Sequence, residues 1–564
     1  MHIEKNICDN VLGTIMNIKG KSKDNVQARL DLEAMKIRPE LHPIHKGDKL
    51  ELPIASYTLS KNEKHLFCLF LKQLRVPDGF SSNISQCVNM KEHKISGLKS
   101  HDCHVLLQHL IPLGIRGLLP SSVCEPLIEL SLFFTSLCAK TLRVDELSQI
   151  EQQIGLTLCK LEQVFLPSFF DVMVHLPVHL ASEAKIGGPV QYRWMYPIER
   201  MLYELKKLIR NMARPEGSIA EGYIAKECMT LCSRYLKSIG TKFNRLERNN
   251  DGGSYTTNAE ISIFSKPGRA LGAGIARNLS DDEWLQAHIY VLKNCDEVQH
   301  FLNEYSEIQN NNVPEMSSDE WNNSFVGWFK SKVTEMNMQC QHTKSESLQS
   351  LARGPIKYVT CFNGYVVNGF RFRIEDNDKG CRTQNSGVYV IGDLGTETNP
   401  VEYYGVLTEI LELQYLGARR VVLFRCRWFN VHDNEKGARV DGYGFTTINP
   451  QRILRTNEPF ILANQASQVF YAIDNMVKGW HVVIKTQPRD LYKMPQSEEV
   501  ENDIVENDSI EDLGEAYQYG ESFNFKCTGD PVNFDNQSTW TRTDVEPIEV
   551  EVSTLKKNRK RKAT

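Results

Sequence analysis

The sequence predicts an α+β protein of several domains. A mainly α-helical N-terminal domain is expected first, then a small antiparallel β barrel or sandwich, then a disordered acidic tail. Apolar residues recur at steps of three and four up to about residue 340, and at steps of two from about residue 355. The last 68 residues carry 16 acidic and 8 basic side chains. A chain of 564 residues has room for roughly three or four domains.

Short elements make up residues 1–56, where Pro39 and Pro43 stop a helix expected over 24–37. The next domain, 57–248, is predicted to be helical. It opens with a capping-box pattern, Ser60 and Glu63, which begins a helix over 60–75. Further helices are expected over 100–112, 121–142, 145–165 and 167–180.

The clearest helix of this domain begins at Pro197, a favourable first-turn residue. An apolar stripe follows at steps of three and four, while glutamates and lysines occupy the other face. The stripe comprises Ile198, Met201, Leu202, Leu205, Leu208, Ile209 and Met212. A second helix is expected from Ser218 to Tyr235.

Residues 249–354 are predicted to be a linker followed by helices. The stretch 249–279 is rich in Asn, Gly and Ser and is expected to be a loop. It contains GRALGAG, which lacks the GK[ST] ending of a phosphate-binding P-loop. Helices are expected over 280–308 and then around Trp321, Phe325 and Trp328.

The β domain is expected over 355–495, because short runs rich in Val, Ile, Tyr and Phe alternate with Gly, Asn and Asp. Within the run 420–428, Val422, Phe424, Cys426 and Trp428 share one face, opposite Leu423, Arg425 and Arg427. The predicted strands are 365–374, 388–392, 403–414, 420–428, 444–447, 468–472 and 480–485.

Charge divides the chain into unlike parts, with a net charge of +4 over residues 1–496 and −8 over 497–564. Nine acids and no base lie between Glu498 and Glu515, so the tail 496–564 is expected to be disordered. It ends in a basic cluster of six cations: Lys556, Lys557, Arg559, Lys560, Arg561 and Lys562. Such a cluster is typical of nuclear-import signals and of phosphate-binding tails. With no long apolar run, we expect no membrane partner.

Two further clusters are candidate sites. Arg419, Arg420, Arg425 and Arg427 lie beside Trp428, so they suit a nucleic-acid surface, although an ordinary solvated strand face fits equally well. His101, Cys103 and His104, with Cys228 and Cys232, offer zinc-type ligands. Their spacing favours core packing instead, so neither a metal nor a cofactor is expected.

Several segments carry a family resemblance. MHIEKNICDNVLGTIMNIKGKSKDNVQARLDL resembles the end of the catalytic region of plant CACTA (En/Spm-type) DNA transposon transposases. GLKSHDCHVLLQHLIPLGIRGLLP and YRWMYPIERMLYELKKLIRNMARPEGSIAEGYIAKE are similar to the helical domain of unknown function that follows it. EYYGVLTEILELQY, VVLFRCRWFN, GFTTIN and PFILANQASQVFYAIDN are similar to the second, C-terminal domain of unknown function. The resemblance covers roughly residues 1–495 in the family's order.

The resemblance implies a product of a plant transposable element. Full-length relatives resemble DDE-type enzymes, whose three carboxylates hold two metals. Glu4 falls where the last of those carboxylates is expected, and residues 1–56 are expected to be a remnant of the catalytic region. Because one carboxylate does not hold two metals, we expect a nuclear, non-catalytic protein that binds DNA or chromatin.

Besides a decayed fragment with no role, two alternatives stay open. In the first, the chain supplies Glu4 in trans to a full-length transposase. In the second, it is a protein–protein assembly module that contacts the transposase or host nuclear proteins, with the helix of Trp321, Phe325 and Trp328 as its anchor. Aromatic residues at that spacing also suit a buried core.

Overall fold

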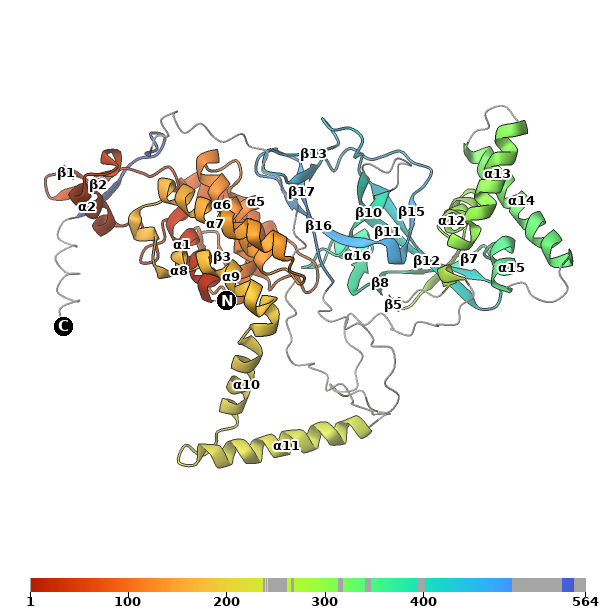
Figure 1. The fold of residues 1–564 in the computed structure, drawn as a ribbon, viewed down its shortest axis with the longest axis horizontal. Coiled ribbons are helices and arrows are strands. Elements are labelled where there is room, and N and C mark those ends of the chain that lie inside the picture. Colours follow the sequence, from red (N-terminus) through yellow and green to blue (C-terminus); the bar gives the residue numbers. More distant parts are fainter. Residues whose placement is uncertain are drawn as a thin grey trace.

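The predicted fold class is confirmed by a computed structural model. The model describes residues 2–236, 239, 241, 261–264, 268–312, 318–339, 346–392, 401–488 and 540–551. A group of N-terminal helices lies at one end of the molecule, an antiparallel sheet at its centre and a second group of helices beyond the sheet (Figure 1).

The N-terminal group follows the predicted order, with one addition and one difference. The addition is α1, which the sequence did not predict. The difference is at Pro112, which does not stop its helix but occupies the second position of α5, after a π-helical turn. The capping box at Ser60 is present as predicted. The helices are α1 (His2–Ile15), α2 (Val26–Met35), α3 (Lys61–Gln73), α4 (Ser100–Val105), η3 (Leu106–Leu110), α5 (Ile111–Ile115), α6 (Ser121–Leu137), α7 (Val144–Val164), α8 (Val172–His175), α9 (Pro177–Gly187), α10 (Tyr196–Lys207) and α11 (Pro215–Tyr235).

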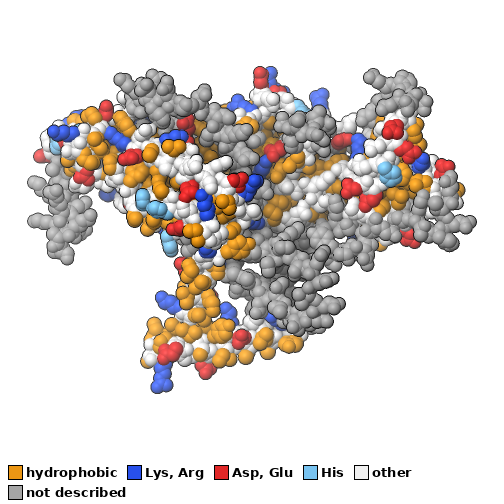
Figure 2. Space-filling model, in the orientation of Figure 1, with side chains coloured by type: hydrophobic (Ala, Val, Ile, Leu, Met, Phe, Trp, Pro, Cys, Tyr) orange, Lys and Arg blue, Asp and Glu red, His pale blue; other side chains and the backbone are white. Residues whose placement is uncertain are grey.

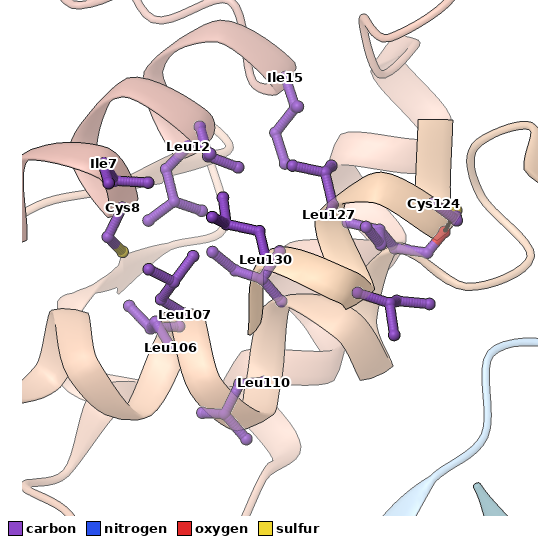
Figure 3. Packing of buried hydrophobic residues seen from close by; sticks show 14 of the residues in the cluster. Ile7, Cys8, Leu12, Ile15, Leu106, Leu107, Leu110, Cys124, Leu127 and Leu130 are labelled. Atoms are coloured by element: carbon purple, nitrogen blue, oxygen red, sulfur yellow. Dashed lines mark hydrogen bonds between the residues drawn. The ribbon is translucent and has the colours of Figure 1, made fainter. Parts of the chain in front are cut away.

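The first hydrophobic core forms where α1, η3 and α6 meet. Figure 3 shows Ile7 and Leu12 of α1 pointing toward Leu107 and Leu130, and all four side chains are buried. Four residues of the β domain belong to the same core: Phe470, Ala472, Val482 and Ile484. The helical part and the β domain therefore share one apolar interior.

Ten strands form the central antiparallel sheet, in the order β13-β14-β17-β16-β10-β11-β12-β15, with β7 on β11 and β6 on β7. They are β6 (Ile275–Asn278), β7 (Tyr358–Phe362), β10 (Gly387–Gly392), β11 (Val401–Tyr415), β12 (Arg419–Trp428), β13 (Ala438–Val440), β14 (Thr446–Ile448), β15 (Phe460–Leu462), β16 (Ser467–Ile473) and β17 (His481–Lys485). A separate three-stranded sheet comprises β5 (Arg269–Leu271), β8 (Gly364–Val367) and β9 (Phe370–Arg373). Two short pairs lie among the helices: β1 (Ile44–Lys46) with β2 (Lys49–Leu52), and β3 (Val88–Asn89) with β4 (Lys94–Ile95).

The faces predicted for residues 420–428 agree with the packing of β12. Phe424, Cys426 and Trp428 pack against β8 and β9, whereas Leu423 packs against helices on the opposite face. The centre of the domain thus has three layers, in which a sheet lies between a smaller sheet and a helical group. This helical group comprises α12 (Asp281–Lys293), α13 (Gln299–Asn312), α14 (Ser318–Gln339) and α15 (Glu346–Arg353).

Two sequence predictions in this region are wrong. The single strand expected over 365–374 is a hairpin, because Asn368 and Gly369 both have positive φ, 52° and 73°, and form its two-residue turn. The loop expected over 249–279 contains β5 and β6. Within GRALGAG, Gly272 has a φ of 87° and lies between the two strands. β5 pairs with β8, and β6 pairs with β7.

Part of the acidic tail is ordered, although the sequence predicts disorder over 496–564. Residues 540–551 run beside the N-terminal helices, and β18 (Ile548–Glu551) adds a third strand to β1 and β2. The Arg38 guanidinium lies 4.1 Å from the ring centroid of Trp540, and Arg542 pairs with Glu63. The acidic composition of the tail therefore does not determine whether residues 540–551 are ordered, because residues far away in the sequence supply their contacts.

Arg116 joins the helical part to the β domain. Its guanidinium is fully buried, pairs with Asp441, and donates to Asp474 Oδ1 at 2.9 Å. The ring centroid of Phe445 lies 4.8 Å from it. Nearby, Asn475 Nδ2 donates to the carbonyl oxygen of Gly114 at 3.0 Å. We call this contact the Arg116 joint.

Three histidines, of which His101 and His288 are buried and His109 is half-buried, predict a stability that falls in mild acid. Burial lowers the pKa of His101 and His109 to about 4, and that of His288 to about 3. The unfolded chain takes up these protons below about pH 6.5, whereas the folded chain does not. We therefore expect the urea midpoint to fall between pH 6.5 and pH 4. Equal urea midpoints at pH 7.5 and pH 5 would contradict this prediction. His109→Leu should reduce the pH dependence of the urea midpoint more than substitution of the exposed His45 does.

Candidate functional site

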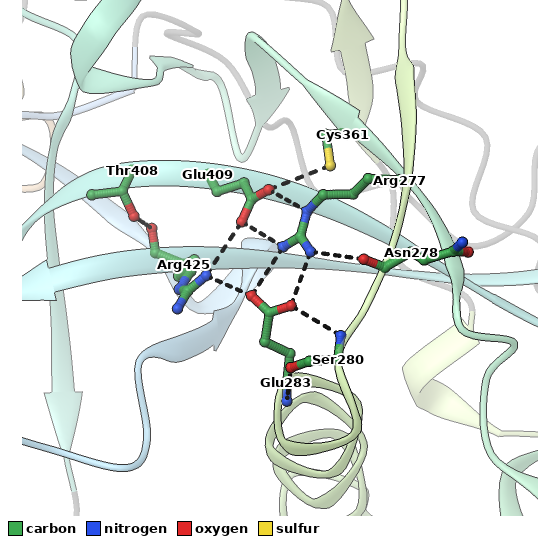
Figure 4. A network of polar contacts seen from close by, with 8 residues as sticks. All are labelled: Arg277, Asn278, Ser280, Glu283, Cys361, Thr408, Glu409 and Arg425. Atoms are coloured by element: carbon green, nitrogen blue, oxygen red, sulfur yellow. Dashed lines mark hydrogen bonds and ion pairs between the residues drawn. The ribbon is translucent and has the colours of Figure 1, made fainter.

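Four charged side chains from four elements meet on the face of the central sheet (Figure 4). Arg277 comes from β6, Glu283 from the first turn of α12, Glu409 from β11 and Arg425 from β12. Glu409 and Arg425 are direct cross-strand partners. The hydroxyl of Ser280 accepts the backbone N–H of Glu283 at 3.2 Å, and this capping box fixes the first turn of α12. We call these four residues the Arg–Glu cluster.

The Arg–Glu cluster is held by paired hydrogen bonds. Arg277 donates from Nε to Glu409 Oε1 at 2.7 Å and from Nη2 to Oε2 at 2.9 Å, a bidentate contact. Arg277 also donates to Glu283 Oε2 at 2.9 Å. Arg425 donates to Glu283 Oε1 at 2.8 Å and lies 3.6 Å from Glu409 Oε2. Two cations and two anions thus balance within one cluster.

The electrostatics follow from this pairing. Hydrogen bonding to Glu409 raises the pKa of the Arg277 guanidinium, and hydrogen bonding from Arg277 lowers the pKa of the Glu283 carboxyl. Arg277 and Glu283 therefore stay ionised near neutral pH. The cluster holds α12 against the sheet and has no net charge of its own.

A cavity of about 460 Å³ lies beside the cluster, lined by Ile275, Cys361, Phe362, Asn363, Ile374, Thr408, Glu409 and Arg425. Burial and the neighbouring Glu409 raise the pKa of the Cys361 thiol to about 11. The thiol therefore stays protonated near neutral pH, and its sulfur lies 3.4 Å from Glu409 Oε1. A protonated thiol is a poor nucleophile, so this lining does not favour nucleophilic chemistry by Cys361.

Each of the four arginines proposed for a nucleic-acid surface has a carboxylate partner. Arg425 belongs to the Arg–Glu cluster, and Arg427 pairs with Glu375 at 2.9 Å. Arg420 lies 3.3 Å from Glu412, and Arg419 lies 3.8 Å from Glu346. The partner reduces the charge that each offers to a phosphate. Arg420, with 63% of its side chain exposed, is the most accessible of the four.

Glu4, the candidate catalytic carboxylate, is buried between α1, α4 and η3. Its Oε1 accepts a hydrogen bond from Gln108 at 2.7 Å, and its Oε2 pairs with His104. Burial opposes ionisation, but the charge and hydrogen bonds of His104, together with Gln108, lower the pKa of Glu4 overall. In this structure Glu4 connects helices, and both carboxylate oxygens are already occupied.

The remaining predicted residues do not come together as a site. Cys103 is buried in the first core, whereas Cys228 and Cys232 are exposed on α11. Across the described ranges, no group of three or more His, Cys, Asp or Glu side chains is arranged to hold a metal ion. The basic cluster Lys556–Lys562 lies outside the described residues. No helix in the described part of the chain is long and apolar enough to cross a membrane.

Sequence reasoning missed Arg277, Glu283 and Glu409. The capping-box pattern of Ser280 and Glu283 is visible in the sequence and marks the start of α12. Nothing local connects Arg277 to Glu409, because 132 residues separate them and only the pairing of β6, β7 and β11 brings them together.

Comparison with protein families gives two matches. Residues 137–250 match the domain of unknown function DUF4218, and residues 411–483 match the domain of unknown function DUF4216. The chain carries two domains of unknown function. The DUF4218 match contains α7 to α11, and the DUF4216 match runs from within β11 into β17. No curated protein and no solved structure matches the chain.

Proposed function

We propose that this chain derives from a CACTA-type transposase of a plant DNA transposon and acts in the nucleus by binding DNA or chromatin, without cutting it. The observation that carries the proposal is the pair of matched domains in one chain. This pair is typical of plant transposase-like proteins. Their order is the order that the sequence resemblance implies.

The packing supports a joint role for the two domains. Leu161 and Phe165 of the DUF4218 match and Phe470 and Val482 of the DUF4216 match belong to the same hydrophobic core. A shared core makes the two domains one body, so a ligand bound by one is held at a fixed position relative to the other.

The state of Glu4 supports binding rather than cleavage. A carboxylate that ligates a catalytic metal needs an oxygen lone pair directed at the metal ion. Both oxygens of Glu4 are engaged by Gln108 and His104. Supplying Glu4 in trans to a longer transposase would first require this buried pair to open.

We assign the main DNA contact to the basic cluster Lys556–Lys562. It has six cations in seven residues, while the arginines of β12 are paired with carboxylates. Each phosphate contact releases about one counterion, and this term dominates sequence-independent binding. The same cluster suits a nuclear-import signal.

Fluorescence anisotropy with a labelled duplex tests this assignment. Replacing the six cations of the cluster with glutamine in the full chain should weaken binding roughly 100-fold or more at low salt. Exchanging each Lys for Arg and each Arg for Lys keeps the charge and should leave affinity unchanged within about threefold. Arg420→Gln with Arg427→Gln should also have a small effect, because both are paired.

Two results would overturn the proposal. One is a full chain that does not bind duplex at low salt. The other is a glutamine variant that binds as tightly as the unchanged chain. A fluorescent fusion of the same glutamine variant should lose its nuclear accumulation, and its retention in the nucleus would contradict the import role.

A further inference from the structure

The ordered part of the C-terminal tail, residues 540–551, packs on the N-terminal part of the molecule. We call residues 540–551 the tail segment, and Figure 1 shows part of it beside β1 and β2. About 50 residues connect it to the β domain, and a chain of that length spans roughly 170 Å when it is extended. Connectivity therefore does not fix where the tail segment lies. Its contacts fix its position, as they do for a bound ligand.

The main chain of the tail segment pairs with an edge of the N-terminal part. β18 runs antiparallel to β2. Closer to the start of the tail segment, the N–H of Arg542 donates to the carbonyl oxygen of Ile54 at 2.8 Å, and the N–H of Ser56 donates to that of Trp540 at 3.0 Å. We call residues 49–58 the docking edge. Addition of an extended peptide to such an edge is a common mode of peptide recognition.

The first anchoring side chain of the tail segment is Trp540. Its ring packs on the first hydrophobic core, and the Arg38 guanidinium lies 4.1 Å from the ring centroid. Arg38 is itself fixed, since its Nη1 donates to the carbonyl oxygen of Phe165 at 2.7 Å and its Nη2 donates to that of Glu162. A cation over an aromatic face attracts it. The N-terminal part thus holds a positioned partner for an aromatic side chain.

The second anchoring side chain is Arg542. It donates from Nη2 to Glu63 Oε1 at 2.8 Å and from Nη1 to Glu63 Oε2 at 2.5 Å, a bidentate contact. Its Nη1 also donates to the carbonyl oxygen of Thr58 at 3.2 Å. The two charged side chains are 13% and 18% exposed, so water screens the pair only partly. Burial opposes ionisation of Glu63, but hydrogen bonds from Arg542 and Ser60 lower its pKa overall.

Net charge does not explain how the tail segment is attached. Figure 2 shows hydrophobic, basic and acidic side chains intermixed at the end of the molecule where β1 and β2 lie. Within β18, Glu549 pairs with Lys49, but both side chains are more than half exposed, and such pairs contribute little. Attachment therefore depends on Trp540, Arg542 and the main-chain pairing.

We propose that the docking edge, with Arg38 and Glu63, is a binding site for an extended peptide that carries Trp and Arg two positions apart. The chain's own tail segment occupies this site as a detachable ligand. A ligand tethered to its own site reaches an effective concentration of up to roughly 1 mM, so it fills the site and still exchanges. The proposal goes beyond DNA binding and uses none of the residues assigned to nucleic acid.

A peptide added in trans tests the proposal. In the full chain, Trp540→Ala combined with Arg542→Ala removes both anchors of the tail segment, and we call this variant the opened chain. A fluorescent peptide of residues 538–552 should bind the opened chain with micromolar affinity, measured by anisotropy. The unchanged chain should bind this peptide at least tenfold more weakly, because its own tail segment competes. A peptide that carries the same two substitutions should also bind the opened chain at least tenfold more weakly.

A substitution in the site itself completes the test. Glu63→Gln in the opened chain should weaken peptide binding about tenfold, because it removes the charged partner of the arginine. Glutamine still suits the third position of the capping box that begins α3, so the helix should be unaffected. Glu183→Gln is the matched control, because Glu183 is exposed on α9, and it should leave the affinity unchanged within about twofold. Unchanged circular dichroism shows that each variant is folded.

Four results contradict the proposal. The first is an opened chain that does not bind the peptide. The second is equal binding by the opened and the unchanged chain, which would mean that the tail segment does not occupy the site. The third is peptide binding that is insensitive to Glu63→Gln. The fourth is an unchanged chain that is a dimer in light scattering and an opened chain that is a monomer, since the tail segment of a second copy would then occupy the site.

Discussion

Replacing Arg116 with methionine is expected to lower the free energy of unfolding by about 3–5 kcal/mol. The guanidinium of Arg116 is fully buried between Asp441 and Asp474, and methionine fills similar space without the charge. Two carboxylates would then lie near each other at the Arg116 joint with their main partner removed. Urea unfolding followed by circular dichroism measures the loss.

The matched control for Arg116 is Arg420→Met. Arg420 also pairs with a carboxylate, Glu412, but its side chain is 63% exposed, so water and salt screen the pair. We expect a loss below about 1 kcal/mol. Equal losses for the two variants would mean that the Arg116 joint does not hold the two parts together.

The second large effect is expected for Phe325→Ala, with a loss of about 3–5 kcal/mol. Phe325 is completely buried in the core between the sheet and the helices α12 to α15. Its ring stacks on Trp321 with centroids 5.3 Å apart and lies 5.4 Å from Tyr305. Removing it leaves a cavity within this aromatic group.

The same variant decides between two interpretations of the aromatic helix. If Trp321, Phe325 and Trp328 form an anchor for another protein, Phe325→Ala should weaken association and leave stability nearly unchanged. Met338→Ala is the control on the same helix, because Met338 is 79% exposed, and we expect little loss. A stable Phe325→Ala variant would contradict the core position.

Local patterns predicted much of the fold. The period-two pattern of residues 420–428 gave the correct faces of β12, and Ser60 with Glu63 gave the correct start of α3. The hairpin turn at Asn368 and Gly369 was also visible in the sequence, but a continuous run of Val, Phe and Arg on either side concealed it.

Local sequence patterns could not predict contacts between residues that lie far apart in the sequence. Arg116 and Asp474 are 358 positions apart, and their pairing depends on how the β domain packs against the helices. The order of residues 540–551 has the same origin, since β18 is paired with β2, which is about 500 positions earlier. The Arg–Glu cluster likewise needs the strand order of the whole sheet.

The salt dependence of duplex binding by the full chain tests the central claim most directly. If the six cations of Lys556–Lys562 each contact a phosphate, the logarithm of the binding constant should fall with the logarithm of salt concentration with a slope of about −5. The glutamine variant of the cluster should have a much shallower slope. A full chain that binds no duplex, or equal slopes for the two proteins, would contradict a DNA-binding role for this cluster.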